Sequence, residues 1–120
     1  MTSSVRRLRA VGEAEIEQLT DLLIDCVEGV SFMHPLSRER AQAFWLHVAE
    51  GVASGARVLL VAEDDWGICG TVQLVLDLPE NQPHRADLAK LLVHSRARRQ
   101  GLGEALTRAA EARAREFGRT

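Results

Sequence analysis

The stretch that decides the fold is VHSRARRQGLGEALTRAAEARA, residues 93–114, which joins an apolar run to a helical pattern through three arginines and two glycines. Gly101 and Gly103 stand where the helix is expected to begin. The first turn of a helix has peptide N–H groups without intrahelical partners and carries the positive end of the helix dipole, so it attracts anions. Glycine removes the Cβ atoms that would hold a phosphate away from these N–H groups. The stretch therefore predicts a turn that binds a phosphate through its backbone.

The same residues have a plainer interpretation. Gly101 would only close a tight turn, and Arg96, Arg98 and Arg99 would form a solvated charged surface, as most charge clusters do. Two better-known phosphate loops do not fit, because the GxGxxG fingerprint requires glycine where Leu106 stands and the P-loop requires Gly-Lys followed by Ser or Thr. Spacing alone leaves both interpretations open.

Two amphipathic helices are expected in the first half of the chain. Apolar residues recur at intervals of three and four from residue 13 to about residue 30, and again after Ser37, a good N-cap residue, to about Gly55. The same periodicity returns in a last helix at about residues 101–117. Its expected inner face consists of Leu102, Leu106, Ala109, Ala110 and Phe117.

The other segments have the pattern of β-strands. Residues 57–63 and 68–77 are β-rich runs separated by the turn sequence DDWG, which predicts an antiparallel hairpin. Further strands are expected at residues 86–94 and, near the N-terminus, at residues 5–10. The order of elements is therefore β-α-α-β-β-β-α, and the fold class is α/β.

Composition limits the classes of function. With 120 residues, 46% hydrophobic and 27% charged, the chain is expected to form one domain, residues 1–120. The net charge of −2 argues against a nucleic-acid binder. Cys26 and Cys69 lack the spacing of a zinc site or a disulfide framework, so no metal is expected and both are interpreted as reduced thiols. No signal peptide and no apolar run of about 20 residues is present, so a cytoplasmic protein without a membrane partner is expected.

The stretch LLVHSRARRQGLGEAL resembles motif A of the GNAT superfamily of N-acetyltransferases, an aliphatic strand followed by Arg/Gln-x-x-Gly-x-Gly/Ala and a helix. Arg98, Gly101 and Gly103 match that signature, and GICGTVQLVL resembles the superfamily's third strand. The resemblance covers essentially the whole chain and implies a GNAT-like fold, a mixed and mostly antiparallel sheet flanked by helices. Among subfamilies, residues 84–106 are most similar to the tabtoxin-resistance type.

The resemblance implies acetyl-CoA as cosubstrate and direct attack of a primary amine of a small molecule on the thioester in a ternary complex. In the family, N–H groups corresponding to residues 99–104 cradle the pyrophosphate, and the fourth strand binds the pantetheine arm. The N–H of Val93 is implied to stabilise the oxyanion. The implied cofactor-binding residues are Leu91, Val93, Arg98, Arg99, Gln100, Gly101, Leu102, Gly103 and Glu104.

The reaction also needs a general base. Asp87 lies six residues before Val93, so strict strand alternation would place both on one face. Several GNAT members carry a carboxylate at the equivalent offset, acting directly or through water, which makes Asp87 the catalytic candidate beside Val93. The alternative interpretation is a solvated carboxylate at the start of a strand. Weaker candidates are Asp77, Glu63, His84 and His94.

The acceptor amine is expected to bind at the loop between the first two helices, which lines the acceptor site in the family. Phe32, Met33 and His34 are the candidate substrate-binding residues, although core packing explains Phe32 more simply.

GNAT folds continue past the motif A helix with a fifth strand, a helix and a hairpin, and the family's frequent general acid is a tyrosine from that half. This sequence contains no tyrosine. We expect the chain to be a fragment of a longer protein; a partner subunit, for example a second copy covering the open sheet edge, is another explanation. The alternative functions are a noncatalytic CoA-binding or phosphate-binding regulatory module, and an interaction domain completed by a partner chain.

Overall fold

The structure, a computed structural model, describes residues 4–30, 37–76 and 87–117, and the side chains of all of these except residues 28–30 and 87. The elements follow the predicted order. They are β1 (Ser4–Leu8), α1 (Glu13–Val30), α2 (Arg38–Ser54), β2 (Arg57–Asp64), β3 (Gly67–Val75), β4 (Asp87–Val93), a 3₁₀ turn η1 (Ser95–Ala97) and α3 (Leu102–Glu116).

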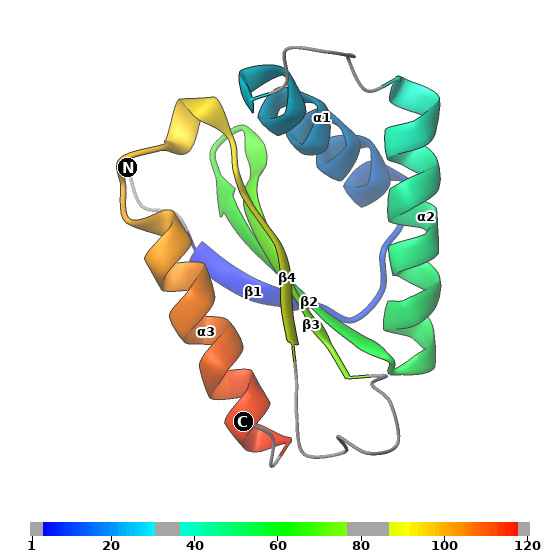
Figure 1. The fold of residues 1–120 in the computed structure, drawn as a ribbon, viewed down its shortest axis with the longest axis vertical. Helices are drawn as coiled ribbons and strands as arrows, with labels where there is room; N and C mark the ends of the chain where they lie inside the picture. Colours follow the sequence, from blue (N-terminus) through cyan, green and yellow to red (C-terminus); the bar gives the residue numbers. More distant parts are fainter. Residues whose placement is uncertain (1–3, 31–36, 77–86, 118–120) are drawn as a thin grey trace.

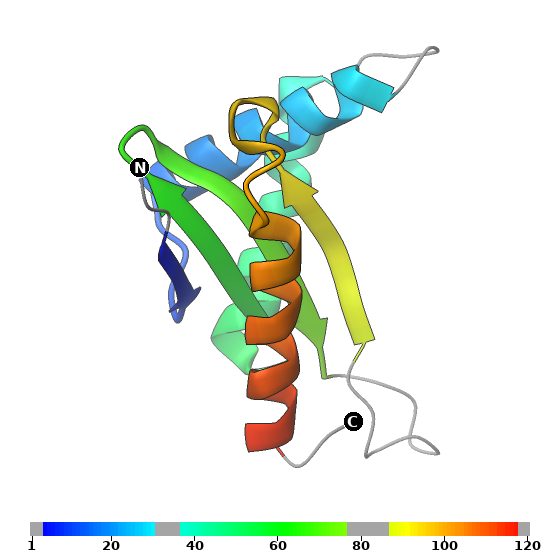
Figure 2. The same cartoon turned by 90° about the vertical axis from the view of Figure 1, so that its left-hand side faces the viewer.

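The four described strands form one sheet in the order β1-β2-β3-β4, and each neighbouring pair is antiparallel. The predicted hairpin is confirmed, because β2 and β3 pair from their shared turn outward. Helices α1 and α2 lie on one face of the sheet and α3 lies on the other (Figure 1). Figure 2 shows α3 running along the sheet beside β4. The domain is thus a three-layer α/β arrangement with β4 at one edge of the described sheet.

Helix α2 begins and ends at the residues that the sequence predicts. The hydroxyl of Ser37 accepts a hydrogen bond from the N–H of Arg40 at 3.1 Å, so Ser37 caps the helix. Gly55 follows the helix in the left-handed conformation, with φ of 85°, which glycine adopts without strain. Both predicted boundaries are confirmed.

Two apolar cores lie on the two faces of the sheet. On one face, α1 and α2 pack against the sheet around Trp45, whose side chain is fully buried. On the other face, α3 buries residues spaced four apart, as expected for one side of a helix. They are Leu102, Leu106, Ala110 and Ala114.

Phe117 is 42% exposed, so its expected place on the inner face of the last helix is wrong. Helix α3 ends at Glu116 and Phe117 follows it as the C-cap, so helical spacing no longer sets the direction of its side chain. The guanidinium of Arg7 lies 5.6 Å from the centroid of the Phe117 ring, a cation–π contact at the rim of the domain. Ala114 occupies the buried position at this end of α3.

Strand β4 contains a bulge. Gly70 and Thr71 of β3 pair with Val93 and Leu92, but Gln73 pairs with Ala89, so β4 has one extra residue between these pairs. Lys90, in this segment, has φ of 51°, in the left-handed region. Its ammonium group lies 5.3 Å from the centroid of the Phe44 ring on α2, a contact that ties the bulge to that helix.

The bulge changes which strand positions share a face. Position 87 pairs with Val75 and position 93 pairs with Gly70. Val75 and Gly70 are an odd number of residues apart on β3, so they belong to opposite faces, and so do their partners. The expectation that Asp87 and Val93 lie on one face is therefore wrong, because strict alternation does not hold through the bulge.

Candidate functional site

The turn between β4 and α3 adopts two left-handed residues in close succession. Arg99 has φ of 66° and Gly101 has φ of 75°. A Cβ atom on Gly101 would meet nothing within 4 Å, so glycine is needed there for the backbone conformation and not for space. These two left-handed residues turn the backbone sharply from the end of β4 into the first turn of α3.

The first turn of α3 presents peptide N–H groups to the surface. Its N-cap is Gly101, which has no side chain with which to cap the helix. The first intrahelical hydrogen bond at this end is donated by the N–H of Ala105 to the carbonyl of Gly101, at 3.0 Å. The N–H groups of residues 102–104 therefore lack helical acceptors, and the positive end of the helix dipole coincides with them.

Gly103 faces open space. A Cβ atom there would meet only Cδ2 of Leu91, at 3.9 Å, which is ordinary van der Waals contact. Within the described chain, neither crowding nor a positive φ requires glycine at this position. The missing side chain instead leaves the surface beside the α3 amides and the edge of β4 unobstructed.

Two of the three arginines hold the turn in place. The Arg96 guanidinium donates from Nε to Asp64 Oδ2 at 3.0 Å, and its Nη2 bonds the carbonyl of Ile68 at 3.3 Å. The side chain of Asp64 is only 7% exposed, and the hydrogen bond from Arg96 holds the pKa of this carboxyl below its ordinary value. Arg98 donates from Nε to the carbonyl of Val93 at 3.2 Å. Both arginines are exposed, as the interpretation of a solvated charged surface expects, but their guanidinium groups also bond to the protein.

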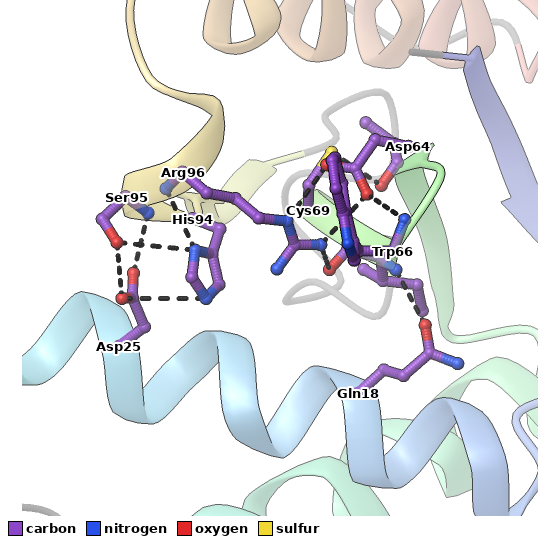
Figure 3. Close-up of polar contacts among 10 residues, drawn as sticks. Gln18, Asp25, Asp64, Trp66, Cys69, His94, Ser95 and Arg96 are labelled. Atoms are coloured by element: carbon purple, nitrogen blue, oxygen red, sulfur yellow. Dashed lines mark hydrogen bonds and ion pairs between the residues drawn. The ribbon is translucent and has the colours of Figure 1, made fainter.

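Asp25 of α1 holds the same turn from the other side (Figure 3). Its Oδ2 accepts from the N–H of Ser95 at 2.9 Å, and its Oδ1 accepts from the Ser95 hydroxyl at 2.8 Å. Partial burial alone would raise the pKa of Asp25, but these two hydrogen bonds, with His94 and Arg98 nearby, hold it below its ordinary value. The carboxylate is therefore ionised at neutral pH.

His94 caps the 3₁₀ turn. Its Nδ1 accepts a hydrogen bond from the N–H of Arg96 at 3.1 Å, and its Nε2 lies 3.7 Å from Oδ1 of Asp25. The ring is thus part of the framework of the turn. Among the other weaker base candidates, Glu63 pairs with Arg6 of β1; Asp77 and His84 lie outside the described residues.

A groove of about 500 Å³ runs along the open side of β4, between this strand and α1. It is mainly apolar, with two cationic side chains, Lys90 from β4 and Arg98 from the turn. Its lining residues are Leu23, Cys26, Val27, Lys90, Leu91, Leu92, Val93 and Arg98.

The peptide groups of Val93 point away from β3, toward this open side. In an antiparallel ladder, hydrogen-bonded and non-hydrogen-bonded pairs alternate. The N–H of His94 donates to the carbonyl of Cys69 at 2.7 Å, so the next pair, Val93 with Gly70, is a non-hydrogen-bonded pair. The carbonyl of Val93 accepts from Arg98 and, at 3.5 Å, from the thiol of Cys26. Burial raises the pKa of the Cys26 thiol, so it remains a protonated donor at neutral pH.

The structure thus brings together most of the predicted cofactor residues. Leu91, Val93 and Arg98 line the groove, and Gly101 to Glu104 form the adjoining start of α3. The side chain of Leu102 is buried in the core, so only its backbone faces the turn. The Glu104 carboxylate pairs with Arg108 one helical turn later, at 2.5 Å. Arg99 and Gln100 are exposed.

Other predicted residues are not brought to the groove by the described part of the chain. Phe32, Met33 and His34 lie outside the described residues. For Asp87 the structure gives only the backbone, as the first residue of β4. The anchors Asp25 and Asp64 were missed by the sequence analysis, because their partners lie 70 and 32 residues away and no local pattern marks them.

Neither a metal centre nor a membrane-spanning segment is found in the parts of the chain that the structure describes. Within residues 4–30, 37–76 and 87–117, no group of three or more His, Cys, Asp or Glu side chains is arranged to hold a metal ion. None of the helices in these ranges is both long and apolar enough to cross a membrane.

Comparison with solved structures identifies the fold. The chain superposes on a GNAT-family protein from Desulfovibrio desulfuricans with a TM-score of 0.74 and 19% identity, covering 98% of this chain and 69% of the other. For a GCN5-related N-acetyltransferase from Ralstonia eutropha the TM-score is 0.73 at 20% identity, and the superposition covers 98% of this chain and 78% of the other. For the PaiA N-acetyltransferase from Thermoplasma acidophilum in complex with coenzyme A the TM-score is 0.71 at 17% identity, and the superposition covers 98% of this chain and 75% of the other.

These likenesses confirm the GNAT-like α/β fold predicted from the turn and the order of elements. The sequence itself gives the family, because residues 16–120 match the family described as the acetyltransferase (GNAT) family. That match includes most of α1, all of α2, the bulged strand and the complete turn before α3. The chain belongs to the GNAT family of acetyltransferases.

Proposed function

We propose that this protein transfers the acetyl group of acetyl-CoA to a primary amine of a small molecule, by direct attack in a ternary complex. Acetyl transfer is the reaction of the family to which the chain belongs, and one structural neighbour is a complex with coenzyme A. One observation carries the proposal for this chain: the outward peptide groups of Val93 and the uncapped start of α3 meet at the same end of β4.

The residues present fit the cofactor. The N–H groups of residues 102–104 suit a pyrophosphate, since they have no helical acceptors and lie at the positive end of the α3 dipole. Gly103 keeps the approach to them open. The edge of β4, where Leu91 is 47% exposed, suits the pantetheine arm, which would bond the strand backbone as an added strand does. Of the remaining predicted cofactor residues, Arg99 and Gln100 would contribute exposed polar groups beside the phosphates.

The N–H of Val93 is the proposed oxyanion donor. Attack of the amine forms a C–N bond and places negative charge on the thioester oxygen; collapse then breaks the C–S bond and releases the CoA thiolate, which takes up a proton. A peptide N–H fixed in a strand is already oriented toward that oxygen and needs no rearrangement when the charge develops. Bonding of the Val93 carbonyl to Arg98 and Cys26 holds the end of the strand in this orientation.

The general base stays a prediction. The β3 partners of positions 87 and 93, Val75 and Gly70, are five residues apart, or about 17 Å at the usual rise per strand residue. An amine held at the Val93 N–H therefore cannot touch Asp87, and a proton would reach this carboxylate only through ordered water. The acceptor residues Phe32, Met33 and His34, the small-molecule amine itself and the tabtoxin-resistance type also stay predictions.

A noncatalytic CoA-binding module is a second candidate. It is favoured by the fact that the main cofactor contacts proposed here, the N–H groups of residues 102–104 and the edge of β4, are backbone groups, which would bind CoA whether or not catalysis follows. An acetyl-transfer assay separates the two functions. Release of free CoA from acetyl-CoA is measured by titrating the CoA thiol, and for an acetyltransferase it should depend on an added primary amine. CoA binding without amine-dependent release would favour the binding module.

Calorimetry tests the cradle itself. The main loss of affinity should lie between dephospho-CoA, which keeps the pyrophosphate, and pantetheine, which lacks it. Replacing Gly101 by a bulky residue, such as Gly101→Leu, should abolish CoA affinity, since the left-handed conformation would be lost. Equal affinity of the variant and the unmodified protein for CoA would refute the cradle.

A further inference from the structure

The turn that carries the proposed phosphate-binding amides is held by a carboxylate of α1, and we infer that this residue, Asp25, is a positioning residue for the cofactor. The inference rests on the proposed function, because it concerns the same turn. Asp25 does not line the groove beside β4, so it would act through Ser95 and not by touching the cofactor.

The contact between Asp25 and Ser95 is bidentate. Both carboxylate oxygens are used, one by the backbone N–H of Ser95 and one by its hydroxyl, at 2.9 and 2.8 Å. A backbone N–H bonded to a carboxylate fixes the peptide plane at the first residue of η1, and bonds to an ionised acceptor are stronger than neutral ones. Asp25 therefore sets where the chain leaves β4.

The neighbouring residue extends this hold to the strand. Cys26, next to Asp25 on α1, donates its thiol to the carbonyl of Val93, which also accepts from Arg98. Residues 93–98 thus form a closed unit that α1 contacts at Val93 and at Ser95. Because Val93 is held by Cys26 and Arg98, a displacement of Asp25 would be felt mainly beyond Ser95, at the start of α3.

The opposite side of the turn has its own anchor. Arg96 reaches Asp64 at the end of β2, so the turn is fixed between α1 and the β2–β3 hairpin (Figure 3). Helix α1 also holds that hairpin, because Gln18 Oε1 accepts from the N–H of Ile68 at 2.7 Å. Gln18 and Asp25 are two helical turns apart on one face of α1. One helix face therefore aligns both supports of the turn.

This support has a physical purpose, since the backbone that follows is strained. Arg99 adopts a left-handed conformation that residues with a Cβ atom rarely take. Such conformations persist where the surrounding structure over-determines them, and they concentrate at ligand sites. Without the Asp25 contact, the turn would relax toward commoner conformations, and the amides of residues 102–104 would no longer converge.

The role of Asp25 can be separated from simple electrostatics. Coenzyme A is an anion, so removal of a nearby carboxylate should strengthen its binding if charge alone matters. A positioning role predicts the reverse. Asp25→Ala removes both acceptors, whereas Asp25→Asn removes the same charge but can accept from the Ser95 N–H and donate to its hydroxyl.

The experiment compares CoA and pantetheine binding, by calorimetry and by amide-shift titration for the weaker ligand. Asp25→Ala should raise the Kd for CoA about tenfold or more, the loss expected for bonds to a charged group. Its affinity for pantetheine, which lacks the pyrophosphate, should stay unchanged. Asp25→Asn should restore CoA affinity to within about threefold of the unmodified protein.

Asp21→Ala is the matched control, because it removes an equal charge from the same helix, where Asp21 pairs with exposed Arg38. Ser95→Ala provides a second variant if Asp25→Ala does not fold, and it should weaken CoA binding selectively as well. Equal losses for CoA and pantetheine, or no loss for either, would overturn the positioning role. Absence of CoA binding in the unmodified protein would instead contradict the proposed function. This outcome differs from the two that overturn the positioning role of Asp25.

Discussion

The place that a Cβ atom would take on Gly103 lies 3.9 Å from Cδ2 of Leu91, so an alanine fits there without displacing its neighbour. Glycine in a helix is less favourable than alanine by up to about 1 kcal/mol. The chain thus forgoes helix stability at the start of α3 while leaving a clear approach between α3 and the edge of β4. A ligand in that space is the simplest physical reason.

Gly103→Leu is therefore expected to separate stability from binding. The variant should fold with a free energy of unfolding equal to or above that of the unmodified protein, because leucine favours helix. Its larger side chain should reduce CoA affinity about tenfold or more. Gly103→Ala is the control, expected to gain stability and to keep CoA affinity, in line with the Gly/Ala variation of the motif that the turn resembles. Urea unfolding and calorimetry measure both quantities; strong CoA binding by the leucine variant would contradict the open approach.

The Asp64–Arg96 pair should make stability depend on pH. Because the pKa of Asp64 is lowered in the folded state, its stabilising contribution is present above the ordinary aspartate pKa and is lost as the pH falls through the lowered folded-state value. Asp64→Asn should be less stable than the unmodified protein by about 1–3 kcal/mol at pH 7. That difference should shrink below about pH 4.

Urea unfolding at a series of pH values checks this expectation. Asp65→Asn serves as control, since Asp65 is exposed in the same hairpin turn and its replacement should change stability by less than about 0.5 kcal/mol. A difference between Asp64→Asn and the unmodified protein that stays constant from pH 7 to pH 3 would show that the pair contributes through packing and not through charge.

The sequence predicts the parts of this fold that depend on local patterns. Ser37 and Gly55 bound α2 as expected, because capping is decided by residues within one turn of the helix. The turn at Gly101 is likewise local, so its glycine spacing predicts its position and its conformation. The position of the turn could therefore be predicted before the structure, whereas its binding of a cofactor stays a prediction.

Contacts across the fold could not be predicted in the same way. The bulge at Lys90 depends on how β4 pairs with β3, and it overturns the same-face argument for Asp87. The anchors Asp25 and Asp64 meet the turn only after the sheet and α1 have packed. Arg98 is a predicted cofactor residue in the sequence, and the structure shows that its guanidinium, like that of Arg96, also bonds to the protein itself.

Asp87→Asn tests the proposed general base. If Asp87 accepts the amine proton through water, the variant should lower kcat about 100-fold, near the lower limit for general base catalysis, with little change in KM for acetyl-CoA. The dependence of kcat/KM on pH should also shift, because a different group would then limit proton removal. Steady-state kinetics from pH 5 to about 9 measure both effects. An unchanged pH profile would remove Asp87 as the base.

Val93→Pro gives the sharpest test of the proposed chemistry, because it deletes the N–H of the proposed oxyanion donor; it also changes a side chain that packs against the core, which the stability comparison below controls for. Proline is accepted on an edge strand where the N–H faces away from the neighbouring strand, and Val93 occupies such a position. Loss of one oxyanion donor should lower kcat about 100-fold to 1,000-fold. Leu88→Pro is the matched control: Leu88 pairs with Leu74 at another non-hydrogen-bonded position of β4 but lies outside the groove.

Both proline variants should unfold at similar urea concentrations, since neither removes a bond of the β3–β4 ladder. Only Val93→Pro should then lose turnover while retaining CoA affinity within about tenfold, because the α3 amides remain in place. Equal turnover in the two variants would assign the oxyanion to another donor. Loss of CoA binding in Val93→Pro alone would instead mean that this N–H binds the pantetheine arm, and that the strand edge contributes to affinity more than to the chemical step.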